Sequence, residues 1–141
     1  MLNPILNLKN LEENMIIVEG GIMEIQKVRI ELTDFMICRF PVSQQLWLEL
    51  IGDISSQPSG TNPGMPVVNV SWSDIHSKFF PAIRTKFQGL SWCLPTEAQW
   101  EYAARGGRYP LRNFIYAGSD EIDEVSWYEG NSFQELYQPG F

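Results

Sequence analysis

The sequence predicts an α+β domain with a small antiparallel sheet, two to three helices and much irregular loop. Alternating apolar and polar residues between positions 15 and 40 indicate short strands. A capped pattern that ends in two glycines indicates a helix over 96–107. Residues 108–141 show little periodicity and are expected to form irregular loop with short strand pieces at 114–116 and 125–128. A chain of 141 residues with 44% apolar and 19% charged residues is typical of one globular domain.

The strand patterns come first in the chain. Residues 15–18 (MIIV) predict a buried strand that Gly20 and Gly21 stop. Residues 28–32 (VRIEL) alternate as a half-buried strand does, and a turn leads into another strand over 35–40. Together these segments predict an antiparallel meander.

Two helical patterns follow the strands. Ser43 is expected to cap a helix, because its hydroxyl can accept a hydrogen bond from a free backbone N–H in the first turn. After a short buried strand over 66–70, Ser71 is expected to cap a second helix with Asp74 in its first turn. Pro81 should kink or restart that helix.

The most ordered pattern is LPTEAQWEYAARGG, residues 94–107. Leu94 and Pro95 are expected to end a strand, and Thr96 is an N-cap whose capping box a glutamine completes three residues later. Trp100 and two alanines are predicted to face inward. We interpret this helix as a structural signature, not a catalytic site. Its residues are Thr96, Glu97, Trp100, Glu101, Arg105 and Gly106.

The charge and the termini limit the partners. A formal net charge of -7 repels nucleic acid and anionic lipid, so neither is an expected partner. Neither a secretory signal nor an apolar run of membrane-spanning length is visible, and a reducing cytoplasm is the default location. Residues 1–13 are expected to form an N-terminal arm, either a short docking helix or a mobile segment, before a domain over 14–141.

The residues that often carry chemistry are few. Cys38 and Cys93 lie in apolar stretches and are predicted to be buried, reduced thiols, although a disulfide between them stays open. One histidine, His76, and two cysteines are too few for a zinc site. Glu97 and Glu101 stand four apart and could act as an acid/base pair. Stabilisation of the helix N-terminus and an ion pair with an arginine four residues on are the preferred interpretations.

The acidic segment 118–124 suggests a different chemistry. Its four acids, beside Asn131 and Ser132, supply the oxygen ligands that calcium prefers, although the spacing is not that of an EF-hand. The alternative is a solvated acidic turn. Trp127, Tyr128 and Asn131 are candidate binding residues, because aromatic side chains dominate the energetics of protein interfaces.

Five blocks of the sequence together resemble the formylglycine-generating enzyme family, also called the sulfatase-modifying-factor domain, over roughly residues 15–132. The resemblance implies a fold similar to that of C-type lectins, with a small antiparallel sheet and much irregular loop. The blocks are VEGG (18–21), DFMICRFPVSQQLW (34–47), PVVNVSW (66–72), LPTEAQWEYAARGG (94–107) and GSDEIDEVSWYEGNS (118–132).

The resemblance also implies what this chain lacks. Members of the family normally continue further, with a second sheet and two cysteines that bind copper and oxidise the substrate cysteine. Neither Cys38 nor Cys93 matches those positions. In the family, the asparagine at the position of Asn131 and the residue after it help to bind calcium, with partner ligands further on.

We therefore expect a non-catalytic protein-binding or ligand-binding module that acts with a partner protein or self-associates. The alternative is the N-terminal part of a copper-dependent formylglycine-generating oxidase, or of a related sulfur-chemistry enzyme, that needs a second chain.

Overall fold

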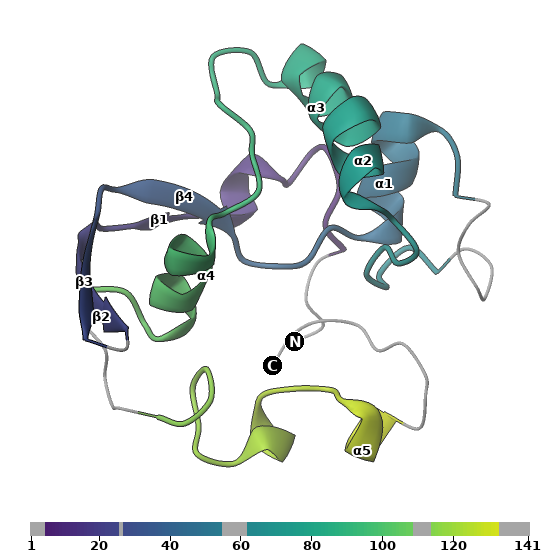
Figure 1. Cartoon of the computed structure of the whole chain (residues 1–141). Coiled ribbons are helices and arrows are strands. Elements are labelled where there is room, and N and C mark those ends of the chain that lie inside the picture. Colours follow the sequence, from purple (N-terminus) through teal and green to yellow (C-terminus); the bar gives the residue numbers. More distant parts are fainter. Residues whose placement is uncertain (1–4, 26, 55–61, 109–113, 133–141) are drawn as a thin grey trace. The chain divides into compact units, whose positions relative to one another are not determined.

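The computed structural model describes residues 5–25, 27–54, 62–108 and 114–132, and it confirms an α+β chain with small antiparallel sheets (Figure 1). The chain divides into two compact units. The elements in chain order are η1 (Glu12–Asn14), β1 (Met15–Val18), β2 (Gly21–Ile25), β3 (Val28–Leu32), β4 (Phe35–Cys38), α1 (Gln44–Ile51), α2 (Trp72–Asp74), η2 (Ile75–Phe79), α3 (Phe80–Lys86), α4 (Glu97–Ala104), η3 (Ile122–Glu124) and α5 (Glu129–Ser132).

The first unit holds the chain up to residue 14 and residues 38–93. Its helix α1 begins as predicted, because the Ser43 hydroxyl accepts a hydrogen bond from Leu46 N at 3.0 Å. The same hydroxyl donates to the carbonyl of Leu6, whose side chain is buried. Part of the expected N-terminal arm therefore packs in this unit. The predicted boundary between residues 13 and 14 stays a prediction.

A continuous helical run, α2–η2–α3, packs beside α1 in the first unit (Figure 1). The predicted cap at Ser71 is present, and it takes the form of a capping box with Asp74. Of the two outcomes predicted at Pro81, a kink or a restart, the structure shows a restart: α3 begins at Phe80 with Pro81 in its first turn. A π-helical turn precedes it, in which Phe80 N–H donates to Ile75 O five residues back. The turn widens the helix just before Pro81, whose ring cannot donate and would crowd a regular α-helical turn.

One line of side chains follows this helical run, and we call it the aromatic column: Trp72, His76, Phe80 and Arg84. The ring of His76 stacks on Trp72 with centroids 3.6 Å apart and meets Phe80 edge-on at 5.2 Å. The Arg84 guanidinium lies over the Phe80 ring at 5.4 Å. Residues four apart drift by about 40° per step around an α-helix. The wider π turn offsets this drift, so the four side chains stay in line.

The core of the first unit lies between α1 and this helical run. Trp47 stacks on Phe79 with ring centroids 5.5 Å apart. Leu46 and Ile83 are its most completely buried large side chains. Each belongs to a different helix, so the core fixes the two helices against each other.

The second unit holds residues 15–37 and the chain from residue 94 to 134. Strands β1 and β3 lie where the sequence predicts them, but the predicted meander is wrong. Gly21 begins β2 instead of stopping a strand, and β2 pairs with β3 in an antiparallel hairpin with Met23 opposite Ile30. β1 pairs with β4 around this hairpin.

Gly20 explains this pairing. A Cβ atom at this position would collide with the carbonyl oxygen of Leu32, so only glycine lets the chain after β1 pass so close to the end of β3. Gly20 N–H also donates to the Asp34 carboxylate at 2.8 Å. These contacts bring the end of β1 to the beginning of β4.

Helix α4 confirms most of its predicted pattern. Thr96 Oγ1 accepts from Gln99 N–H at 3.2 Å, and the Gln99 side chain accepts from Thr96 N–H at 2.9 Å. Arg105 Nε lies 2.6 Å from the Glu101 carboxylate. After the helix, Gly106 and Gly107 adopt the left-handed φ values of 92° and 65° that favour glycine.

The predicted buried face of α4 is wrong. Trp100 is 57% exposed, whereas Tyr102 is only 4% exposed. The Tyr102 hydroxyl donates to Glu19 O at 3.2 Å and lies against Gly21, where a Cβ atom would collide with it. Residues two apart point to nearly opposite sides of a helix. Because the hairpin binds the Tyr102 face, Trp100 points outward.

Four predicted strands are absent from the described residues. Residues 66–70 form only an isolated bridge between Ser43 and Pro66, because Asn69 adopts a φ of 53° that interrupts an extended chain. Residues 90–96 have no regular structure. Residues 114–128 contain the short helix η3 in place of strands. In the described part of the chain, no helix is long and apolar enough to span a membrane.

The corrected face of α4 gives a first prediction. Tyr102→Ala should destabilise the protein by about 3 kcal/mol or more, because it empties a buried site. Trp100→Ala, the matched control on the same helix, should change stability by less than about 1 kcal/mol. Chemical denaturation followed by circular dichroism measures both. Equal losses from the two variants would contradict the orientation described here.

The cap of α2 gives a second prediction. An ion pair and hydrogen bond with Lys78, at 2.7 Å, and hydrogen bonds with Ser71 hold the pKa of Asp74 well below its usual range. A lowered folded-state pKa stabilises the protein above the unfolded-state pKa of about 4, and this stabilisation is lost as the pH falls towards the folded-state value.

The melting temperature of Asp74→Asn should therefore lie below that of the wild type at neutral pH, and the gap should shrink as the pH falls below about 4. Thermal melts between neutral and acidic pH measure this gap. A gap that stays constant over the whole range would show that the Asp74 charge does not contribute.

Candidate functional site

Polar side chains hold together the irregular segment 114–132. The Ser119 hydroxyl, which is buried, donates to the Glu124 carboxylate at 2.6 Å and accepts from Glu121 N–H at 3.0 Å. The Asp120 carboxylate accepts from Ile115 N–H at 2.9 Å. Several acids of the predicted calcium segment therefore serve as hydrogen-bond partners for the chain itself.

Asn131 holds the aromatic end of the same segment. Its side-chain oxygen accepts from Tyr128 N–H at 2.8 Å, and its amide group donates to Ser126 O at 3.0 Å and to the Asp123 carboxylate at 3.3 Å. A hydrogen bond between the Tyr128 hydroxyl and Asp123 raises the pKa of Tyr128. The Tyr128 ring lies against Gly130, where a Cβ atom would come within 2.6 Å of it.

Four large apolar side chains of this segment are between 39% and 71% exposed, and we call them the C-terminal apolar patch: Ile115, Tyr116, Trp127 and Tyr128. The hydrogen bond and charge of Asp123 raise the pKa of Tyr128 most, followed by burial and by the nearby Tyr116. The structure thus places the predicted binding residues Trp127 and Tyr128 at the surface, with Asn131 supporting the backbone and hydroxyl of Tyr128.

The predicted calcium ligands Asn131 and Ser132 both lie in α5. The side-chain oxygen of Asn131 already accepts a hydrogen bond. Within the ranges that the structure describes, no three His, Cys, Asp or Glu side chains gather as a metal site requires. The calcium site stays a prediction.

The cysteines and the histidine lie in the first unit. Both thiols are free; Cys38 is half-buried, and burial raises the pKa of its thiol. Cys93 is exposed, so the prediction of a buried thiol is wrong there. The reason is that residues 90–96 form no strand that could carry the side chain into a core. His76 belongs to the aromatic column, with Nδ1 2.9 Å from Trp72 O.

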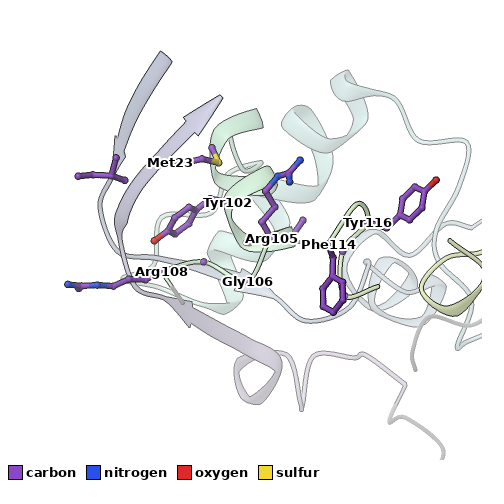
Figure 2. Close-up of a pocket in the computed structure, with 13 residues that line it drawn as sticks. Met23, Tyr102, Arg105, Gly106, Arg108, Phe114 and Tyr116 are labelled. Atoms are coloured by element: carbon purple, nitrogen blue, oxygen red, sulfur yellow. The ribbon is translucent and has the colours of Figure 1, made fainter. Parts of the chain in front are cut away.

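A pocket of about 570 Å³ lies in the second unit, between β2, the end of α4 and residues 114–118 (Figure 2). No pattern in the sequence predicts this pocket. Side chains from three separate segments form it, and the signal in the sequence was the run ARGGR at 104–108, which places two arginines beside a helix end. The labelled side chains around it are Met23, Tyr102, Arg105, Arg108, Phe114 and Tyr116.

Comparison with known proteins places the chain in a family. The model of the Sulfatase-modifying factor enzyme 1-like domain matches residues 6–140. The chaperone protein LppX of Paenibacillus barcinonensis is 29% identical over 86% of this chain and 55% of its own length. No solved structure matches the chain.

Two further relatives carry formylglycine-generating names. The formylglycine-generating enzyme of Streptomyces coelicolor is 35% identical over 62% of this chain and 26% of its own length. The inactive C-alpha-formylglycine-generating enzyme 2 of Bos taurus is 40% identical over 50% of this chain and 22% of its own length. The chain thus spans about half, or less, of these relatives. With the family model matching nearly all its residues, this chain belongs to the sulfatase-modifying factor enzyme 1-like, or formylglycine-generating enzyme, family.

Proposed function

We propose that this chain is a non-catalytic module that binds a partner protein through the C-terminal apolar patch. The observation that carries the proposal is a set of four exposed large side chains on a segment whose polar groups bond to one another. Exposed aromatic side chains supply most of the binding energy in protein interfaces. A surface that is already ordered loses less entropy when it binds.

The names of two relatives support a role without catalysis. The relative aligned with most of this chain is named a chaperone protein, and another is named an inactive formylglycine-generating enzyme. The family therefore includes proteins whose names do not imply formylglycine formation. The C-terminal apolar patch supports the same role, because it is a surface suited to protein recognition.

A second candidate function is favoured by the Streptomyces coelicolor relative, which is named a formylglycine-generating enzyme. Under this hypothesis, the chain is the N-terminal part of a copper-dependent oxidase. Copper is bound by thiolate and imidazole groups. In the described residues, Cys38 is half-buried, Cys93 is exposed and His76 is stacked, and they do not gather into a group of three donors. These residues do not fit copper by themselves, so we derive no catalytic step.

The binding proposal gives a third prediction. The chain should slow the aggregation of chemically reduced insulin, used as a client with exposed apolar segments and followed by light scattering. The double variant Trp127→Ala/Tyr128→Ala should need about 30-fold more protein for the same effect, because each of the two aromatics contributes on the order of 1 kcal/mol at an interface.

Trp100→Ala is the matched control, since Trp100 is an exposed aromatic in the same unit outside the patch. It should act like the wild type. The proposal fails if the wild-type chain does not slow aggregation, or if Trp100→Ala weakens it as much as the double variant does. Light scattering of each protein alone separates client binding from self-association, the other interaction that an exposed patch favours.

The enzyme candidate gives a fourth prediction. If the non-catalytic proposal is correct, titration of Cu(I) against a competing chromophore should show no tight site in the isolated chain. The Cys38→Ser and Cys93→Ser variants should then behave like the wild type. Tight copper binding that either substitution abolishes would favour the enzyme instead.

A further inference from the structure

We propose that the pocket between β2, the end of α4 and residues 114–118 takes a large apolar side chain of the partner that is flanked by carboxylates. This inference rests on the proposed function, because it names the chemistry of the segment bound beside the C-terminal apolar patch.

The pocket has an apolar floor that is already formed. Met23 and Tyr102 are both buried side chains that line it. The Tyr102 hydroxyl is tied to Glu19 O, and its ring rests beside Gly107, whose left-handed φ turns the chain away after α4. A volume of about 570 Å³ lies in the range of known ligand sites and has room for a large side chain.

The charge around this floor selects an anionic occupant. The chain carries a net charge of -7, yet Arg105 and Arg108 line the pocket, and no acidic residue is among its described lining residues. In Figure 2 the two arginines extend from opposite sides of Tyr102. An apolar side chain that enters the pocket therefore has an arginine side chain on each side of it.

Arg105 is held in place for this role. Its Nε, one of the five N–H donors of a guanidinium, lies 2.6 Å from the Glu101 carboxylate one helical turn back. The side chain is still about half exposed. This ion pair fixes the guanidinium at the end of α4, so a carboxylate of the partner can reach it without a change in the helix.

The pocket and the C-terminal apolar patch form one continuous surface. Tyr116 belongs to the patch and also lines the pocket. One extended segment can therefore place an apolar side chain in the pocket and continue across Tyr116. At the pocket a basic segment would meet two arginines, so acidic residues are favoured on either side of the apolar side chain that enters it.

The test uses three fluorescent peptides and the full chain. The first peptide carries one phenylalanine between two aspartates, the second carries it between two lysines, and the third replaces the phenylalanine of the first with alanine. Fluorescence anisotropy measures each dissociation constant at low and high salt. The aspartate–phenylalanine peptide should bind about tenfold more tightly than either of the others at low salt, and high salt should reduce this advantage.

Three variants locate the site. Arg105→Gln and Arg108→Gln should each weaken the first peptide about threefold, and Arg29→Gln, a matched loss of one exposed arginine in β3, should not. Ala117→Trp adds a large side chain at the exposed rim and should block the first peptide without disturbing the buried floor. Circular dichroism confirms that each variant folds.

Equal affinity for the three peptides, or equal effects of Arg29→Gln and the pocket variants, would overturn this inference. The two proposals fail separately. If Trp127→Ala/Tyr128→Ala abolishes protection of insulin while the pocket variants bind peptides as the wild type does, the patch functions without the pocket. If the peptides bind as expected but insulin aggregates freely, the pocket inference survives and the broader function is wrong.

Discussion

The packing of Tyr102 against the turn between β1 and β2 is the constraint on which the second unit depends. One side chain satisfies the Glu19 carbonyl, occupies the space that Gly21 leaves free and forms the floor of the pocket. The hairpin sets which face of α4 is buried, and the glycines after the helix direct the chain onward. A single contact thus orients α4 against β2 and forms part of the pocket.

The segment 114–132 shows how side-chain hydrogen bonds can order a chain that has little regular secondary structure. Its hydroxyl, carboxylate and amide side chains bind neighbouring backbone groups, as those of Ser119, Asp120 and Asn131 do, in place of a regular ladder of backbone hydrogen bonds. In this arrangement Ile115, Tyr116, Trp127 and Tyr128 remain exposed. The polar residues order the backbone and the aromatic residues face outward, which is the reverse of a normal core.

The sequence predicted what short-range interactions decide. Ser43, Ser71 and Thr96 cap their helices through groups at most three residues away, so their patterns were sufficient. The family was likewise predictable from blocks of sequence. Long-range contacts decided the rest. Nothing near Trp100 shows that the hairpin binds the opposite face, and β1 pairs with β4 because Gly20 passes close to the end of β3.

The strand predicted at 66–70 is absent and the pocket was not predicted, and in both cases the sequence pattern lacks the necessary information. An apolar run indicates burial but not extension, and Asn69 turns the backbone away from a strand. The pocket combines residues from three distant segments, and no periodicity connects them. Cys93 is exposed because residues 90–96 do not form the strand that was expected to carry its side chain into a core.

The π turn before Pro81 has a consequence for how this protein can change during evolution. Such a turn holds one residue more than an α-helical turn, so it is the local trace that a one-residue insertion leaves in a helix. Deleting one exposed residue there, such as Ser77, would restore the α-helical repeat while α3 kept its buried residue Ile83 towards the core. Length variation of this kind is normally confined to loops. Here a helix can tolerate it, at the expense of the spacing that keeps Trp72, His76 and Phe80 in line.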